Sequence, residues 1–504
     1  MAETATTLEQ RPDALNARDD VDEPFHAAFL WTVAGLAVAV LWIRPMVASL
    51  WTDELGTWWV ISGNARDAVT RAQAVQGQSP FYYLIAWAAR HLVGQSEVGL
   101  RLPSLVFSFI AAFIVFRIAK RLVDIEAARI SVIAFVVWPS IAFAASDARP
   151  YALATLCVVA SMWALIVWLD SGRVRWGLVY VVVGASTSIV HPLFGLVVLP
   201  QVIYGIARLR AGSTSIRPRD LVLAVTGIAI LTIPVGLEVL ALWRRQQDWS
   251  IPGDVTVAWV VLILVPPALI GAAILGGLLS APSLRIEPRV AAMPRSSVIL
   301  LVGWFIIPVA VLVLLAVVSS IKLLEARYLL AAAPAAAILA AVAIRSLEPA
   351  RARRIVVLVF VILSIMDLAS PVKSGDFRSA AASVRSVAND HSVIFVRSGF
   401  QESLQPGWYD DPTRSGLLTA ATDYYPVPGT VVPIPANLDP STIDLVRGEV
   451  ERSIDTANQI VVVTLSGSPY GPWFDQFMQD RGWTKQPVAD VNLFTITEFD
   501  RGSP

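Results

Sequence analysis

Long apolar segments recur through the first three quarters of the chain and are separated by short polar connectors. Each segment is about as long as a helix that crosses a bilayer, which needs roughly 20 mostly apolar residues. The pattern predicts an all-α polytopic membrane protein with about eleven spans. The expected spans are residues 27–47, 99–120, 127–146, 150–169, 176–191, 192–209, 220–243, 256–280, 297–319, 328–345 and 355–370.

Arginine-rich connectors alternate with connectors that are poorer in basic residues, and this predicts the orientation. Basic connectors lie on the cytoplasmic side of most membrane proteins. The N-terminus is then cytoplasmic and the C-terminus extracytoplasmic. Residues 1–25 are polar and acidic, so we expect a disordered cytoplasmic tail and no cleaved signal. The basic connectors contain Arg117, Lys120, Arg121 and Arg129; Arg173 and Arg175; Arg208, Arg210, Arg217 and Arg219; Arg285, Arg289 and Arg295; and Arg345, Arg351, Arg353 and Arg354.

Two regions are expected outside the bilayer, on the side opposite those connectors. The first is the loop 49–98, in which the short apolar stretch 79–94 predicts a helix lying in the membrane interface. The second is 371–504, where alternating strand and helix patterns predict a small α/β domain. Residues 26–370 would then form the transmembrane domain. The expected strands are 392–397, 430–435, 459–465 and 492–499, and the expected helices are 378–388, 441–457 and 472–482.

Composition supports a membrane protein and excludes several other classes. Hydrophobic residues make up 56% of the chain and charged residues 15%, whereas about a quarter of a soluble chain is charged. The mean hydropathy of +0.63 excludes an ordinary soluble enzyme. A net charge of zero gives no electrostatic case for binding nucleic acid. Cys157 is the one cysteine, so there is no intrachain disulfide and no cysteine-rich metal site.

Polar residues beside apolar spans are costly and usually line a site. Here the conspicuous ones all lie at the expected outer ends of the spans, which predicts one extracytoplasmic site. Simpler roles are open for each: helix capping for Asp53, interfacial placement for Arg101 and Arg149, and mutual pairing for Asp147 and Arg149. The full set is Asp53, Glu54, Glu97, Arg101, Asp147, Arg149, Tyr151, His191, Arg244, Arg245, Asp248, Lys322, Glu325, Arg327 and Tyr328.

The chemistry of this set suits transfer of a sugar from a lipid carrier. A carboxylate can accept the proton of an attacking hydroxyl. Arginines can hold a carrier phosphate through paired hydrogen bonds and stabilise the charge that develops when the phosphate leaves. An apolar groove between spans would house the lipid tail.

Six segments, in order and at the expected span ends, resemble the bacterial branch of the C-type (GT-C) membrane glycosyltransferases. That branch is similar to protein O-mannosyltransferases and to the aminoarabinose transferase that acts on lipid A. The resemblance covers about residues 25–390. The segments are WTDELGTWW, SPFYYLIAW, SEVGLRLPSLVFS, SDARPYALATL, SIVHPLFGL and EARYLLAAAP.

This resemblance implies roles for particular residues. Asp53 corresponds to the base that activates the acceptor, and Glu54 to the acid that contacts the acceptor. Arg101 is expected near the donor phosphate, together with Arg149. The further residues implied are Arg327 and Tyr328 in the donor site, and Asp147, Tyr151, His191, Tyr82 and Tyr83 as other site candidates. No cofactor is expected, although a divalent ion held by Asp53 and Asp147 stays an alternative.

The expected partners are a polyprenyl-phosphate-linked sugar, a lipid, glycan or protein acceptor, and the lipids of the plasma membrane. The identities of the sugar and acceptor stay open. A transporter or flippase of a lipid-linked saccharide is the main alternative, but it predicts charges near span centres and two matched halves. A polysaccharide polymerase or ligase and a non-enzymatic scaffold are further alternatives.

Overall fold

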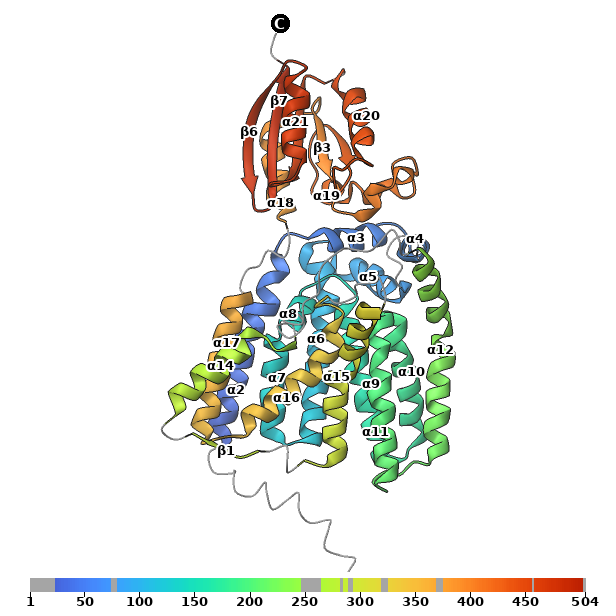
Figure 1. Ribbon diagram of the computed structural model, residues 1–504, viewed down its shortest axis with the longest axis vertical. Coiled ribbons are helices and arrows are strands. Elements are labelled where there is room, and N and C mark those ends of the chain that lie inside the picture. The colour runs from blue at the N-terminus through green and yellow to red at the C-terminus, as the bar shows by residue number, and fades with distance from the viewer. Residues whose placement is uncertain are drawn as a thin grey trace, which may run out of the picture.

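A computed structural model describes residues 23–73, 79–245, 264–281, 284–288, 293–318, 325–368, 375–455 and 457–501. A bundle of long helices carries a layer of short helices at one end, and an α/β domain lies beyond that layer (Figure 1). The predicted tail up to residue 22, the start of the predicted span 256–280, Asp248 and Lys322 lie outside the described residues. Arg244 and Arg245 end a helix, and their side chains are also outside the described part.

Each of the eleven predicted apolar segments contains a helix. In chain order these helices are α2 (Glu23–Val38), which continues through η1 (Ala39–Ile43) and η2 (Arg44–Val47), α6 (Glu97–Leu122), α7 (Ile125–Val137) with α8 (Pro139–Ala145), α9 (Tyr151–Ser171), α10 (Val174–Val190), η4 (Pro192–Val197) with α11 (Val198–Arg210), α12 (Pro218–Arg245), α14 (Pro267–Ser280), α15 (Arg295–Val318), η7 (Leu329–Ala332) with α16 (Ala333–Arg345), and α17 (Ala350–Leu368).

Length and composition qualify a smaller number of these helices as membrane spans. Six of the described helices are long and apolar enough, and the bent pair α7 and α8 makes a seventh. Three shorter apolar helices are Val174–Val190, Pro267–Ser280 and Leu329–Arg345. The chain is therefore a multi-pass membrane protein, and the count of eleven stays a prediction.

The predicted span 127–146 is not one straight helix. Helix α7 ends at Val137, and α8 leaves it at an angle of 70°. Pro139 explains the break, because proline lacks an N–H and forces the preceding residue out of the helical region. Trp138 accordingly has extended backbone angles.

The helices bury small residues and expose large apolar ones, as expected of a bundle in lipid. Ala335, Ala337 and Ala341 of α16 are fully buried, and α16 packs against α7. Small residues allow such close approach of helices in a membrane. The outer surface carries exposed apolar side chains such as Val317, which is 77% exposed.

A buried ionic cluster ties four helices together at the end of the bundle opposite the α/β domain. The carboxylate of Glu126 in α7 accepts a hydrogen bond from His26 in α2 at 2.9 Å. It also pairs with Arg345 of α16 at 2.9 Å and with Arg353 of α17 at 2.6 Å. These groups stabilise one another where lipid would leave them unpaired.

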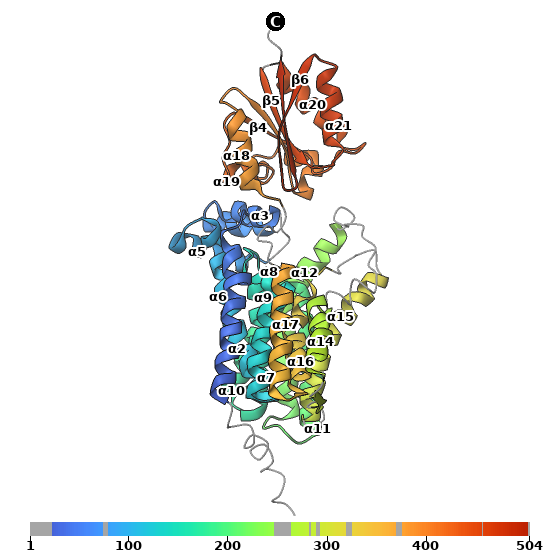
Figure 2. The same cartoon turned by 90° about the vertical axis from the view of Figure 1, so that its left-hand side faces the viewer.

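The described part of the predicted loop 49–98 forms three helices that lie across the end of the bundle, beneath the α/β domain (Figure 1 and Figure 2). They are α3 (Thr52–Ile61), α4 (Ala65–Arg71) and α5 (Pro80–Val93). Helix α5 occupies the stretch predicted as an interfacial helix. Helix α3 is capped from Trp51, so Asp53 lies inside its first turn, and the capping role considered for Asp53 is wrong.

The C-terminal domain has a five-stranded sheet in the order β4-β3-β5-β7-β6, with β4, β3 and β5 parallel and the other two antiparallel. Separate hydrophobic cores cover its two faces. Strand β6 was not predicted, because its polar residues show no apolar alternation. The elements are α18 (Phe377–Val387), β3 (Val393–Arg397), η8 (Gln401–Leu404), η9 (Pro406–Trp408), η10 (Ser415–Leu417), α19 (Ala420–Tyr424), β4 (Thr430–Ile434), α20 (Ile443–Ile454), β5 (Gln459–Leu465), α21 (Tyr470–Gln479), β6 (Trp483–Val491) and β7 (Phe494–Arg501).

The C-terminal domain is docked on the bundle through specific contacts. The Tyr425 hydroxyl accepts a hydrogen bond from the backbone N–H of Leu50 at 2.9 Å and donates to Glu97 at 3.0 Å. Arg378 also pairs with Glu97. Apolar residues of this domain, including Phe400 and Trp408, belong to the same hydrophobic core as the bundle helices. The domain therefore forms part of the surface beside the predicted site.

Candidate functional site

Asp53 lies between two arginines that the chain brings from distant segments. Its Oδ2 accepts a hydrogen bond from Arg327 Nη1 at 3.0 Å and lies 3.9 Å from Arg149 Nη2. Among the described residues, no hydrogen bond reaches the other oxygen, Oδ1. The Asp53 side chain is 26% exposed. A carboxylate with one oxygen oriented by arginine and the other uncommitted can accept a proton from a bound hydroxyl.

The two arginines differ in how deeply they are held. Arg149 lies in the turn between α8 and α9, where its side chain is 4% exposed and donates a hydrogen bond to the Tyr83 hydroxyl at 3.2 Å. Arg327 precedes η7, and its side chain is 25% exposed. Its Nε lies 2.7 Å from the Glu325 carboxylate. Arg149 is therefore a fixed charge, and Arg327 is the more accessible one.

Aromatic rings line the same place. His191 lies between Tyr151 and Tyr328. The centroid of its ring is 5.7 Å from that of Tyr151 and 5.6 Å from that of Tyr328. The guanidinium of Arg327 lies over the Tyr328 ring at 5.3 Å. Burial, together with the charges of Arg149 and Arg327, lowers the pKa of His191 to about 3. His191 is consequently neutral over the physiological range and cannot serve as a cation for phosphate.

Arg101, which is predicted to lie near the donor phosphate, is held by contacts within the protein. It is fully buried, and each of its guanidinium nitrogens donates within the protein. Nε and Nη2 bind Glu54, with Nε to Oε1 at 2.7 Å. Nη1 binds the carbonyl of Ala48 at 2.7 Å, and Nη2 also binds that of Ser49 at 3.0 Å. A guanidinium with all its donors used in this way has none left for a phosphate.

Glu54, which is predicted to contact the acceptor, is likewise held by contacts within the protein. It is fully buried. Its Oε1 accepts from Arg101 and from the backbone N–H of Ala148 at 2.9 Å, and its Oε2 accepts from Arg101 and the backbone N–H of Trp51. Glu54 thereby joins α3, α6 and the turn that carries Arg149.

The remaining predicted residues surround the Asp53 site. Asp147 is fully buried, and its Oδ1 accepts a hydrogen bond from the Trp51 indole at 2.9 Å. Asp147 therefore binds Trp51, whereas Asp53 binds Arg327. Tyr82 and Tyr83 are also buried, with ring centroids 5.4 Å apart. Within the described part of the chain, no group of three or more His, Cys, Asp or Glu residues is arranged to hold a metal ion.

Glu402 is a site residue that was not predicted from the sequence. It comes from η8 of the C-terminal domain, is 8% exposed, and interacts electrostatically with Asp53 and Arg149. The segment containing it touches α3, because a side chain at Gly399 would lie 2.7 Å from Thr52. Burial raises the pKa of Glu402, and the charge of Asp53 adds to this effect. No local pattern marks this residue, since only the docking of the domain brings it to the site.

Comparisons with known proteins bear on the family and the fold of the chain. Residues 77–237 match the family described as dolichyl-phosphate-mannose-protein mannosyltransferase. The fold is similar to ArnT from Cupriavidus metallidurans bound to undecaprenyl phosphate, with a TM-score of 0.54 and 12% identity over 94% of this chain and 98% of that one. No curated protein sequence matches the chain.

A second similar structure is the archaeal oligosaccharyltransferase AglB from Archaeoglobus fulgidus in complex with an inhibitory peptide and a dolichol-phosphate. Its TM-score is 0.51, with 10% identity over 88% of this chain and 69% of that one. The family match and these shared folds confirm the resemblance predicted from the sequence: this chain has the fold of the GT-C membrane glycosyltransferases, and residues 77–237 match their mannosyltransferase family.

Proposed function

We propose that this protein transfers a sugar from a polyprenyl-phosphate carrier to a hydroxyl acceptor at the outer face of the plasma membrane. The observation that carries the proposal is the placement of the Asp53 carboxylate between Arg149 and Arg327 at one end of the spans. A base can accept the proton of the attacking hydroxyl, and two cations beside it can stabilise the negative charge on the leaving phosphate.

Arg149 and Arg327 are the residues that we assign to the carrier phosphate. When a phosphate enters, its oxygens replace part of the interaction of these two arginines with Asp53. A phosphate oxygen offers a guanidinium the same kind of charge-assisted hydrogen bond as a carboxylate does. Tyr328 and His191 form the neutral wall beside them. The resemblance also assigned Arg101 to this phosphate, and its internal contacts argue for a positioning role instead.

The reaction that we propose balances around the anomeric carbon of the sugar. Asp53 Oδ1 takes the proton of the acceptor hydroxyl as the hydroxyl oxygen forms a bond to that carbon. The bond from the carbon to the carrier phosphate breaks, and its electron pair leaves with the polyprenyl phosphate. Arg327 and Arg149 stabilise the added negative charge on the leaving phosphate.

The arginine-rich connectors support the proposed orientation, with the C-terminal domain and Asp53 outside the cytoplasm. Nucleotide sugars are not expected on that side, which favours a lipid-linked donor. A reporter fused after Pro371 should be active only if it is an extracytoplasmic reporter. Activity of a cytoplasm-only reporter at that point would contradict the orientation.

Release of carrier by purified protein tests the activity itself. A panel of polyprenyl-phosphate sugars, each with detergent-solubilised envelope glycolipids and glycans as acceptors, should yield free polyprenyl phosphate for at least one donor. We expect equal release in the presence of EDTA, because we assign no step to a metal. Movement of an intact lipid-linked saccharide across a vesicle membrane without carrier release would favour a flippase and contradict the proposal.

A further inference from the structure

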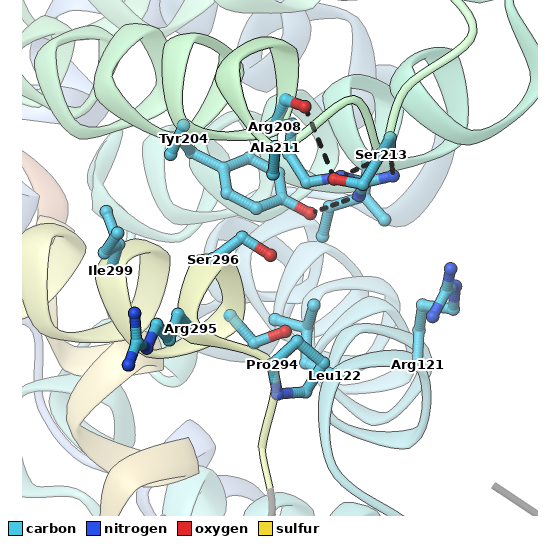
Figure 3. Close-up of a pocket in the computed structure, with 13 residues that line it drawn as sticks. Arg121, Leu122, Tyr204, Arg208, Ala211, Ser213, Pro294, Arg295, Ser296 and Ile299 are labelled. Carbon is cyan, nitrogen blue, oxygen red and sulfur yellow. Dashed lines mark hydrogen bonds between the residues drawn. The ribbon is translucent and has the colours of Figure 1, made fainter. Parts of the chain in front are cut away.

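A cavity of about 420 Å³ opens at the end of the spans opposite the C-terminal domain (Figure 3). It lies between the last turns of α6 and α11 and the first turn of α15. Asp53 and its arginines lie at the other end of the bundle, so the cavity is separate from the proposed transfer site. Its polar lining includes Arg121, Tyr204, Arg208, Ser213, Arg295 and Ser296.

The cavity carries an excess of positive charge. Arg208 pairs with Asp170 at 2.9 Å and donates to the Tyr204 hydroxyl at 2.9 Å, and Arg121 pairs with the same Asp170 at 3.0 Å. Arg295 pairs with no carboxylate of the described residues. Three arginines around the cavity therefore share one acidic partner, which leaves a net positive charge to attract an anion.

The first turn of α15 adds to this attraction. The helix begins at Arg295, and Ser296 lies in its first turn with its hydroxyl directed toward the cavity in Figure 3. The N–H groups of a first helical turn have no partner within the helix and favour a negatively charged ligand. The N–H groups of Ser297 and Val298 already donate to the Pro294 carbonyl, so a phosphate in the cavity would meet guanidinium and hydroxyl donors.

Apolar surface continues from the cavity along the bundle. Ile299 lines the cavity and is 40% exposed, and Val302 and Ile306 follow it on the same face of α15. On α11, Ala207 lines the cavity, and the exposed Ile203 lies one turn before it. A free phosphate would not contact this apolar surface, whereas the acyl chains of a lipid would lie against it.

We propose that this cavity binds the phosphate headgroup of an anionic phospholipid in the leaflet opposite the C-terminal domain. Basic pockets between spans commonly bind such headgroups. The headgroup phosphate lies beside Arg208 and the hydroxyls of Tyr204 and Ser296, and its acyl chains follow α11 and α15. Arg121 and Arg295 add positive charge from opposite sides of the cavity. The site is independent of the proposed transfer reaction, because none of its residues contacts Asp53, Arg149 or Arg327.

Native mass spectrometry of the full-length protein with phosphatidylglycerol tests the proposal. Arg295→Gln and the double variant Arg121→Gln/Arg295→Gln remove charge at the cavity. Arg295 pairs with no carboxylate in the described part of the chain, so this variant should fold. We expect lipid affinity to fall about tenfold in Arg295→Gln and further in the double variant, because each substitution removes a positive charge that attracts the headgroup.

Arg219→Gln is the matched control, since Arg219 lies at the same end of the bundle, its side chain is 70% exposed, and it does not line the cavity. It should bind phosphatidylglycerol as the wild type does, and excess inorganic phosphate should not displace the lipid. Equal lipid binding by Arg219→Gln and the double variant would overturn the proposal. Displacement by inorganic phosphate would overturn the assignment to a lipid. Carrier release should be unaltered in Arg295→Gln, which separates this result from a failure of the proposed transfer function.

Discussion

Arg101 and Glu54 form a doubly hydrogen-bonded ion pair in which both side chains are fully buried. The pair joins α6 to the first turn of α3, and Asp53 is the neighbour of Glu54 in that turn. Because Arg101 also holds the carbonyls of the segment 45–49, the path of the chain into α3 is fixed. The position of Asp53 therefore depends on two residues that do not face the proposed substrate.

Breaking this pair should destabilise the protein. Removing one partner of a buried ion pair typically costs about 3 to 5 kcal/mol, because the other charge stays buried and unpaired. We expect Arg101→Ala and Glu54→Gln to lower the midpoint of thermal unfolding in detergent. Arg447→Ala, which removes an ion pair whose side chains are 49% and 86% exposed, should have a much smaller effect. If Arg101→Ala unfolded like the wild type but lost carrier binding, Arg101 would return to the donor site.

Arg327 should govern affinity for the carrier. Its partly exposed side chain lies beside Asp53 at the opening of the site, so Arg327→Gln should fold normally. Loss of a hydrogen bond to a charged group typically costs about 1.5 to 3 kcal/mol, or roughly 10- to 100-fold in Kd. Titration with polyprenyl phosphate measures this. Arg447→Gln in the C-terminal domain is the control, and equal affinity in the two variants would contradict the assignment.

Glu402 should make stability depend on pH. Its pKa is raised above the usual 4.5 by burial, so the folded state binds this proton more tightly than the unfolded state does. The stability that it contributes is present below about pH 4.5 and is lost as pH rises through the folded-state pKa. Glu402→Gln should therefore gain thermal stability over the wild type as the pH is raised.

Thermal unfolding of both proteins from acidic to neutral pH measures this difference. Glu451→Gln provides the control, because the Glu451 side chain is 49% exposed on α20. A difference between Glu402→Gln and the wild type that did not change with pH would contradict the raised pKa.

His191 should not titrate in the working range of the protein. A pKa of about 3 leaves the ring neutral from mildly acidic to basic pH. The pH profiles of carrier release should have the same shape in the wild type and in His191→Asn, even where the rate differs. An inflection near the ordinary histidine pKa that disappears in His191→Asn would show that the ring becomes charged.

Hydropathy could place the helices, because each span must satisfy its backbone internally and present apolar side chains to lipid. It also predicted that Asp53, Arg149 and Arg327 lie at the same end of the bundle, because each follows or precedes a span at its predicted outer end. Hydropathy could not predict which residues form hydrogen bonds or ion pairs with them. Arg101, like Arg149, is an arginine at the outer end of a predicted span. Only the path of the segment 45–49 shows that the Arg101 guanidinium donates to backbone carbonyls within the protein.

Other features depend on contacts between residues that are far apart in the sequence. Glu402 reaches the site only because its domain docks on α3. His26 has no distinguishing neighbours in the sequence, yet it pairs with Glu126, which lies 100 residues away. The cavity beside Arg295 needs three helix ends to meet. The periodicity of apolar residues carries no information about such long-range contacts.

The central claim is that Asp53 is the base. Asp53→Asn keeps the size of the side chain and its hydrogen bond from Arg327 but removes the proton acceptor. A positioned base typically contributes about 100- to 10,000-fold to the rate. Asp444→Asn, at a side chain that is 86% exposed in the C-terminal domain, is the control.

The decisive measurement is carrier release by purified Asp53→Asn, made together with carrier binding by the same sample. We predict that the rate falls about 100-fold or more while the carrier still binds, and that Asp444→Asn matches the wild type. Asp147 is buried against Trp51, so Glu402 would be the next acid to consider as the base. Release by Asp53→Asn at more than about a tenth of the wild-type rate would contradict the claim.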